Sequence, residues 1–237
     1  MPNLLEREGE REMILNHTFD EELHVYTVDG QYVLSTSDII SLNGLADYGS
    51  IPKAVLDHAS WRGTELHKAI EYYELDGAVE SMPEEVEPYF EGYIKFKKDY
   101  DFEPIGELEK QIVYQHEGTE QAVGCTIDLR GLVKGQPYIL DAKTTAKMYG
   151  KALRSKCLAW RLQLSSYSEA TDCDWEWWKL TGGVDVHDPA GKGIVQVNRE
   201  GGYTFHDFSQ TDDSHLWDSA VRMAVAKLSA GFQIDRR

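Results

Sequence analysis

Residues 124–143 read GCTIDLRGLVKGQPYILDAK, two apolar runs around a single turn signal, Lys134-Gly135. Glycine at the second position of a two-residue turn supplies the positive φ that such a hairpin requires. Counting outward from this turn pairs the two arms residue by residue and sets Asp128 opposite Asp141. Facing residues of a β-ladder have Cβ atoms roughly 4.5–5.5 Å apart. The segment therefore predicts a β-hairpin that brings two carboxylates together.

Two like charges at facing positions destabilise a sheet unless a cation lies between them. Carboxylate oxygens are the ligands that magnesium and manganese prefer. Because side chains alternate along a strand, Lys143 is expected on the same face as Asp141, with Ala142 pointing away. The hairpin thus offers two carboxylates and one ammonium to a small volume. An Asp-x-Lys tripeptide is also common by chance, and a solvated strand face often carries both signs of charge.

Two segments on either side of the hairpin predict helices. Residues 158–170 place Gln163 and Tyr167 four positions apart, and therefore on one helical face. Residues 61–71 carry an apolar face with His67 at its edge. A histidine in such a place is more often packed or solvated than bound to a metal, so His67 gains meaning only from the rest of the pattern.

The ordered set Gly-x-x-x-His, Gly-x-x-x-Asp, Asp-x-Lys and Gln-x-x-x-Tyr runs from Gly63 to Tyr167. It resembles the RecB-like branch of the PD-(D/E)xK nuclease superfamily, which includes CRISPR-associated spacer-acquisition nucleases and small phage and mitochondrial exonucleases. The likeness extends from about Val25 to Gln233. It implies an α/β fold with a restriction-endonuclease-like core, in which a mixed central β-sheet is flanked by helices, and an N-terminal helical region that forms one wall of a substrate channel.

The resemblance implies a metal site. His67, Asp128 and Asp141 would ligate Mg²⁺ or Mn²⁺ together with the backbone carbonyl of Ala142. Asp128, Asp141 and Lys143 would be the catalytic residues, with Lys143 orienting or activating the attacking water. A metal on two carboxylates makes water nucleophilic near neutral pH and offsets charge on the phosphate, and the ammonium adds electrostatic stabilisation. An imidazole ligand favours manganese somewhat.

Four further residues receive roles from the same resemblance. Gln163 and Tyr167 would support the site and touch the nucleic-acid backbone. Glu109 corresponds to a glutamate that family members often carry at the start of the preceding strand, and it is a possible supporting residue. Glu71 lies one helical turn after His67, where it either supports the histidine or faces solvent.

The net charge of −17 argues against a nucleic-acid enzyme, because such proteins usually show a basic footprint. The charge is uneven, however: residues 142–168 contain six basic residues and no acidic one. Local field rather than net charge steers a phosphate backbone. The alternative is a solvated helix face that happens to lack acids. The cations of this stretch that we expect to contact DNA are Lys147, Lys151, Arg154 and Arg161.

The cysteines indicate which cofactors to expect. Several relatives hold an iron–sulfur cluster on four cysteines, whereas this chain has only Cys125, Cys157 and Cys173. We therefore expect neither an iron–sulfur cluster nor a structural zinc, and free thiols in a reducing compartment. There is no apolar run of membrane-spanning length and no signal-peptide pattern. These features predict a soluble, cytoplasmic protein, in the host cytoplasm for a phage-encoded chain, without a membrane partner.

The pattern predicts an acidic leader over residues 1–22 and a single nuclease domain over 23–237. Within that domain, residues 23–104 form a hairpin and helical wall, 105–170 the catalytic core, and 171–237 C-terminal strands and a helix. Residues 175–180 contain three tryptophans that either form a buried strand or stack on bases. Strands are expected near 24–28, 31–35, 107–115, 122–132, 138–143, 175–180, 193–197 and 203–208, and helices near 6–15, 52–74, 83–100 and 158–170, with a last helix capped by Asp213.

The sequence thus predicts a metal-dependent deoxyribonuclease, and most specifically an exonuclease that acts on single-stranded DNA or DNA ends in recombination, repair or replication. Two alternatives remain. The chain could be a DNA-binding or spacer-capturing subunit with secondary nuclease activity. It could also be an acidic interaction protein built on a nuclease-like scaffold.

Overall fold

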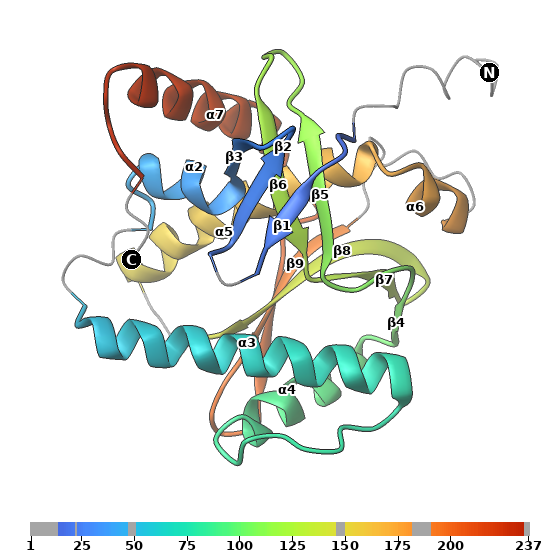
Figure 1. Cartoon of the computed structure of the whole chain (residues 1–237). Helices are drawn as coiled ribbons and strands as arrows, with labels where there is room; N and C mark the ends of the chain where they lie inside the picture. The colour runs from blue at the N-terminus through green and yellow to red at the C-terminus, as the bar shows by residue number, and fades with distance from the viewer. Residues whose placement is uncertain (1–13, 22, 47–50, 146–149, 182–190, 235–237) are drawn as a thin grey trace.

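The computed structural model describes residues 14–21, 23–46, 51–145, 150–181 and 191–234. Within these ranges the chain forms a mixed α/β fold with two five-stranded sheets and six helices (Figure 1). Both sheets are mixed, because each contains one parallel pair of strands among antiparallel neighbours. The predicted α/β class is confirmed. The single central sheet is not, since the strands divide into two sheets.

The first sheet has the strand order β1-β2-β3-β6-β5. Its β2–β3 hairpin is the predicted one, and the turn residues Asp29 and Gly30 have φ of 50° and 75°. Strand β1 shows that part of the segment assigned to a leader is an edge strand of this sheet. The helix expected near residues 6–15 lies mostly outside the described residues. The strands are β1 (Thr18–Asp20), β2 (Val25–Val28), β3 (Gln31–Ser35), β5 (Lys110–Gln115) and β6 (Ala122–Ile127).

The second sheet has the order β10-β9-β8-β7-β4 and contains the predicted hairpin as β7 and β8. Ladder pairs run from Leu129–Leu140 to Val133–Gln136, and both turn residues, Lys134 and Gly135, have positive φ. The predicted register is therefore confirmed. The strands are β4 (Phe102–Pro104), which the sequence did not predict, β7 (Leu129–Val133), β8 (Gln136–Thr144), β9 (Gly191–Val197) and β10 (Tyr203–Asp207).

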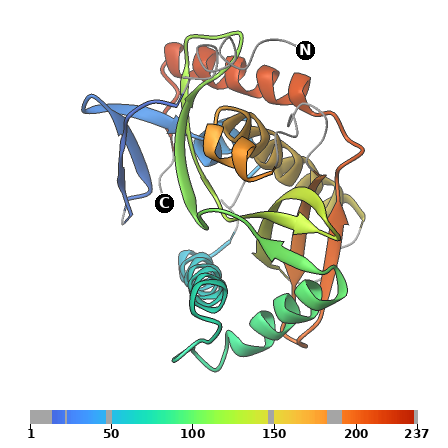
Figure 2. The same ribbon diagram turned by 90° about the vertical axis from the view of Figure 1, so that its right-hand side faces the viewer.

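The strand predicted over residues 122–132 breaks at Asp128. Strand β6 ends at Ile127 in the first sheet, and β7 begins at Leu129 in the second. The backbone carbonyl of Asp128 accepts a hydrogen bond from the amide of Glu109 at 3.1 Å. Twisted strands can pass from one sheet to another at such a point, and aspartate has low strand propensity. Figure 2 shows the two sheets diverging beyond this break.

The helices cover both faces of the second sheet (Figures 1 and 2). Helices α3 and α4 pack on one face, where Leu140, Ala142, Val195 and Val197 belong to one apolar core. Helix α5 packs on the other, where Ile139 and Ile194 belong to a second core. The helices are α2 (Thr36–Leu42), α3 (Lys53–Asp76), α4 (Glu87–Asp99), α5 (Gly150–Asp172), α6 (Trp175–Leu180) and α7 (Ser214–Ser229).

Two helical segments differ from their predictions. Residues 175–180 form helix α6 rather than a strand, because the Asp174 side chain accepts hydrogen bonds from the amides of Glu176 and Trp177 and caps the helix. Asp213 does precede α7, but its side chain forms no capping bond. Its carboxylate pairs with the Arg161 guanidinium, with 2.8 Å between Nε and Oδ2.

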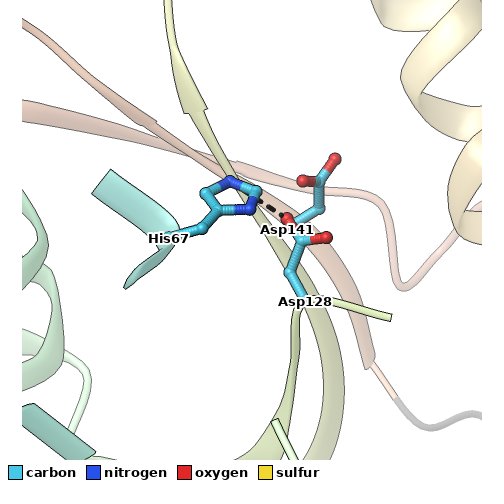
Figure 3. Close-up of side chains that lie close together, drawn as sticks. All are labelled: His67, Asp128 and Asp141. Carbon is cyan, nitrogen blue, oxygen red and sulfur yellow. Dashed lines mark ion pairs between the residues drawn. The ribbon is translucent and has the colours of Figure 1, made fainter. Parts of the chain in front are cut away.

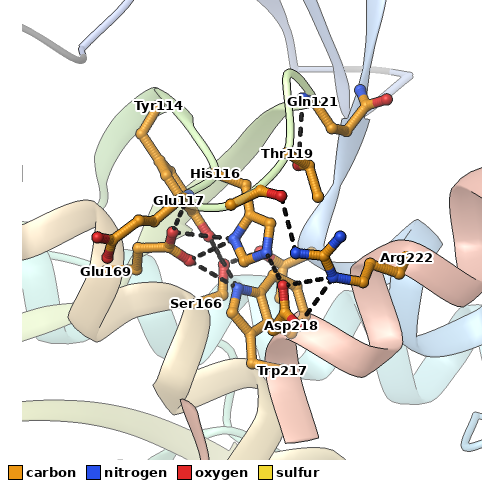
Figure 4. A network of polar contacts seen from close by, with 12 residues as sticks. Tyr114, His116, Glu117, Thr119, Gln121, Ser166, Glu169, Trp217, Asp218 and Arg222 are labelled. Atoms are coloured by element: carbon orange, nitrogen blue, oxygen red, sulfur yellow. Dashed lines mark hydrogen bonds and ion pairs between the residues drawn. The ribbon is translucent and has the colours of Figure 1, made fainter. Parts of the chain in front are cut away.

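A polar network fixes helix α5 against β5 and α7 (Figure 4). The His116 ring, 3% exposed, lies 2.8 Å from Glu169 Oε2 on α5 and 3.3 Å from Asp218 Oδ1 on α7. The Trp217 indole also donates to Glu169 Oε2, at 3.0 Å. The Ser166 hydroxyl lies 3.0 Å from the Tyr114 hydroxyl and so extends the network along α5. This network orients the helix whose opposite side carries Tyr167.

No helix within the described ranges has the length and apolarity needed to cross a membrane.

Candidate metal centre

Three elements bring three ligand-type side chains together (Figure 3). Asp141 comes from β8, Asp128 from the break between β6 and β7, and His67 from the middle of α3. One ligand atom from each residue lies within 4.8 Å of the other two. Asp141 and Asp128 are 0% and 5% exposed, so both carboxylates are inside the protein.

The hairpin register explains why the two aspartates meet. Asp128 continues β7 backward by one residue and so lies opposite Asp141, next to the last ladder pair. Its Oδ2 accepts a hydrogen bond from the Ala142 amide at 3.3 Å. The Ala142 methyl points away into the core beneath α3 and α4, as the alternation along the strand predicts.

His67 contacts both sides of this junction. Its Nε2 lies 2.9 Å from the Ala142 carbonyl oxygen and 3.4 Å from Asp128 Oδ2, and its Nδ1 lies 3.2 Å from Glu109 Oε1. Burial opposes the charged imidazole, but the carboxylates of Asp128 and Glu109 outweigh it and raise the pKa of His67 to about 10. Nearby carboxylates thus favour the protonated form of the His67 imidazole.

Asp141 is a buried carboxylate whose negative charge is only partly compensated by nearby protein groups. Within the described part of the chain, neither of its buried carboxylate oxygens has a hydrogen-bond partner of regular geometry. The Lys143 ammonium approaches Oδ2 at 2.8 Å and supplies opposite charge. Burial nevertheless raises the pKa of Asp141 well above its usual range, and the nearby charge of Asp128 adds to this effect. A divalent cation fits such a site, since it would satisfy buried oxygens that protein donors leave open.

Gln163 and Tyr167 lie on one face of α5, as predicted, and the Gln163 amide donates to the Tyr167 hydroxyl at 2.7 Å. Tyr167 is 4% exposed. Burial raises its pKa well above 10, and the charges of Asp128 and Asp141 raise it further. The phenol is therefore neutral near the two carboxylates, where it can act as a hydrogen-bond donor.

The two glutamates of uncertain role differ in their surroundings. Glu109 immediately precedes β5 and pairs with His67, so it belongs to the site. Glu71 is half-buried on α3. Among the described side chains, the carboxylate that contacts His67 from outside the aspartate pair is that of Glu109 rather than Glu71.

Of the predicted DNA-contacting cations, the structure describes the side chains of Arg154 and Arg161. Lys147 lies outside the described residues, and so does the side chain of Lys151, although its backbone is part of α5. Arg154 is exposed on α5. Arg161 is held by Asp213 at the start of α7, and this pairing removes it from the set of cations available to a phosphate backbone.

One buried polar residue next to Lys143 was not predicted from the sequence. Gln196 lies on β9 as the direct ladder partner of Lys143, and it is 7% exposed. The signal available in the sequence was a lone glutamine inside the apolar run Gly193-Ile194-Val195-Gln196-Val197. That signal alone could not identify its neighbour, because strand pairing across a long connection is not readable from spacing.

The cysteines lie apart from one another in the chain and are free thiols. Cys125 is buried in β6, and burial raises its pKa. Cys157 is part of α5, and Cys173 follows that helix.

Comparisons with known proteins leave the chain without an assigned family. No family model and no curated protein matches it. Among solved structures, the one described as "Crystal structure of SSO0001" matches with a TM-score of 0.42 and 13% sequence identity, over 88% of this chain and 81% of that chain. A likeness at that level carries no argument about function.

Proposed function

We propose that the protein is a metal-dependent deoxyribonuclease of the PD-(D/E)xK type, and specifically an exonuclease that acts on single-stranded DNA or DNA ends. The observation that carries this proposal is the buried carboxylate pair of Asp128 and Asp141 with His67 in ligand range. The burial of Asp141 supports a metal site, because its Oδ1 has no hydrogen-bond partner in the described structure and its Oδ2 has only the nearby Lys143 ammonium, at 2.8 Å, as compensating charge.

His67, Asp128 and Asp141 would hold Mg²⁺ or Mn²⁺, with the Ala142 carbonyl next to the imidazole as a further oxygen donor. When bound, the metal would lower the pKa of water and offset the charge that develops on the phosphate. Metal binding requires a neutral imidazole, so His67 would release its proton on loading.

The remaining side chains supply positioning and charge. Lys143 is 27% exposed, so its ammonium can leave Asp141 and donate to a phosphate oxygen or to the attacking water. The neutral Tyr167 hydroxyl, which accepts from Gln163, can donate to a carboxylate oxygen and hold it in place. Each of these groups comes from a regular element, which limits its movement during the reaction.

The depth of the site favours a single strand as substrate. Both aspartates are at most 5% exposed, while the side chains of His67 and Lys143 are 23% and 27% exposed. A duplex would have to bring its stiff backbone to buried carboxylates, whereas a flexible single strand can bend toward them. Exposed Arg154 on α5 can contact its phosphates.

The test uses the full chain with MgCl₂ or MnCl₂ and end-labelled DNA. We expect cleavage of linear single strands, loss of at least about 10³-fold in rate for Asp128→Ala, and loss of about 10²–10³-fold for Lys143→Ala. Manganese binding, measured by calorimetry, should be lost in Asp128→Ala and kept in Lys143→Ala. Lys68→Ala is the matched control, because Lys68 adjoins His67 in the chain but is exposed.

Circular single-stranded DNA separates the two modes of cleavage, since an exonuclease leaves a circle intact. A wild-type protein that hydrolyses no substrate with either metal, or that cleaves at the same rate as both variants, would refute the proposed mechanism.

A further inference from the structure

Gln196 lies beside Lys143 in the second sheet. Strands β8 and β9 are parallel, and these two residues are direct partners in the ladder, just as Ile194 is the partner of Asp141. Partners in a ladder point to the same face, so the Gln196 side chain lies next to that of Lys143 and on the face of Asp141. Gln196 is 7% exposed within a strand of buried apolar residues. A carboxamide in such surroundings is destabilising unless both of its ends are bonded.

Both ends of this carboxamide are bonded. The Gln196 Oε1 atom lies 2.8 Å from Nε2 of His206 on β10, and the Gln196 Nε2 atom donates to the Thr145 carbonyl at 3.4 Å. The ladder between β8 and β9 ends at the pair Thr144–Val197. The carboxamide therefore holds the chain at Thr145, two residues after Lys143 and beyond the last ladder pair.

The Thr145 carbonyl can only accept, so it fixes which end of the carboxamide faces β8, and His206 bonds the opposite end. The ring packs 5.3 Å from the Trp160 ring and 6.4 Å from that of Phe208. Burial lowers its pKa, so the imidazole is neutral at pH 7. A carbonyl oxygen can only accept, which places the imidazole proton on Nε2. The Gln196 oxygen is therefore committed to His206, and the amide hydrogens face Thr145.

We propose that Gln196, held in orientation by His206, is a positioning residue for Lys143. This inference rests on the proposed nuclease function. Lys143 has a long side chain with one end in the site, so the position of its ammonium depends on where the strand end carrying it is fixed. Displacement of a catalytic group by about 1 Å costs on the order of 10²-fold in rate. Loss of the Gln196 carboxamide should therefore lower kcat and leave KM and metal affinity unchanged.

The experiment compares Gln196→Leu and His206→Phe with the wild-type full chain. We expect each variant to lower kcat on linear single-stranded DNA by about 10–100-fold, with KM and the Mn²⁺ dissociation constant within about twofold of wild type. The double variant should lose no more than the single ones, because both changes break the same chain of bonds. A reduction in the amount of folded protein would instead lower the Mn²⁺ stoichiometry, which calorimetry reports.

Tyr138→Phe is the matched control. Tyr138 lies on β8, the strand that carries Lys143, but its hydroxyl bonds to Asp207 and Ser209 at the end of the strand far from Lys143. Removing that hydroxyl breaks a comparable polar link and should leave kcat unchanged.

Hydrogen exchange of residues 141–145 provides a readout independent of cleavage. Gln196→Leu should accelerate it by about tenfold or more, and Tyr138→Phe should not. Exchange that is unchanged in Gln196→Leu overturns this inference, whether or not the wild-type protein cleaves DNA. A wild-type protein that cleaves no DNA refutes the proposed nuclease function, which is a separate result. Faster exchange with wild-type kcat, or a raised KM at constant kcat, also overturns it.

Discussion

At the scale of single residues, Asp141 is a buried carboxylate whose charge is unfavourable in its surroundings. A carboxylate with no exposed surface and no regular hydrogen bond is destabilising even with an ammonium 2.8 Å away. A position that only harms the fold is readily replaced by an uncharged residue of similar shape. Under the proposed function, a bound cation would reverse the sign of this contribution.

This account predicts opposite effects of Asp141→Asn without and with metal. In EDTA the variant should melt at a higher temperature than wild type, because a buried like-charge pair is removed. With Mn²⁺ at about 100 times its dissociation constant, wild type should gain roughly 2.7 kcal/mol, or about 5–10 °C, and the variant much less. Thermal melting under both conditions tests this, and Asp57→Asn at an exposed position of α3 is the control. An equal manganese shift in both proteins would contradict it.

Residues whose positions depend on local spacing could be predicted from the sequence. The facing aspartates follow from the turn at Lys134, and the shared face of Gln163 and Tyr167 follows from helical periodicity. Contacts between distant segments could not be predicted from spacing, and only the family resemblance grouped His67 with the two aspartates. The pairing of Glu109 with His67 depends on how α3 approaches β5, and this is a property of the packed structure.

At the scale of elements, α5 connects the site to the rest of the molecule. Its Tyr167 face meets the carboxylates, while Glu169 two residues later is bound by His116 and Trp217. The polar network therefore helps to orient the helix that carries Tyr167 and Gln163 beside the candidate metal centre. Weakening this network should loosen the helix before it affects the hairpin.

His116→Phe should lower stability by roughly 1–3 kcal/mol in acidic to neutral solution. Burial opposes the charged ring, but Glu169 and Asp218 raise the pKa of His116 above 6.5. A raised pKa in the folded state stabilises fully below about pH 6.5 and is lost as pH rises through the folded pKa. The difference between wild type and variant in urea unfolding should therefore shrink from pH 5.5 to pH 9.

His215→Phe, at an exposed position on α7, should show no such trend. A His116→Phe penalty of the same size at both pH values would mean that the ring acts through packing rather than charge, and a penalty that grows with pH would contradict the raised pKa.

The elements themselves were predicted best where pattern and capping agreed. Alternating apolar residues identified β2, β3, β8, β9 and β10 close to their observed bounds. Helix α6 was assigned as a strand because three tryptophans favour strands, whereas the hydrogen bonds made by Asp174 start a helix there. The capping residue was visible in the sequence, and it was the better guide.

At the scale of the whole molecule, strand β8 belongs to both apolar cores. Ile139 points into the core with α5 and α7, and the next residue, Leu140, points into the core with α3 and α4. The candidate metal centre lies between these cores, with His67 on one side and Tyr167 on the other. The part of the molecule around the core with α5 and α7 and the part around the core with α3 and α4 should therefore unfold in one cooperative transition.

Ile139→Ala and Leu140→Ala test this coupling. Each should lower stability by about 2–5 kcal/mol, because both side chains are 0% exposed. Tryptophan fluorescence reports mainly on the Ile139 core, where Trp160, Trp177 and Trp217 are buried, and far-ultraviolet circular dichroism reports on the whole fold. The two signals should keep a common urea midpoint in both variants. Separate midpoints in either variant would show that the halves unfold independently.

The division into two sheets was the main feature of the fold that the sequence did not reveal. Residues 122–133 alternate as one continuous strand, whereas β6 ends at Ile127 in the first sheet and β7 begins at Leu129 in the second. Twist accumulates over many strands, so a short window of sequence carries little trace of it.

The Lys134–Gly135 turn is exposed at the far end of the hairpin, and its length sets the register that places the two aspartates opposite each other. One residue added to that turn would move every pair on β7 by a single step and rotate Asp128 out of line with Asp141. Lys134→Ala should keep the register, whereas a side chain at Gly135 would strain its positive φ. A change in the length of the turn should disrupt the candidate metal centre without touching a ligand. Under the proposed function, the length of this surface turn would therefore matter for metal binding as much as the identity of the two aspartates.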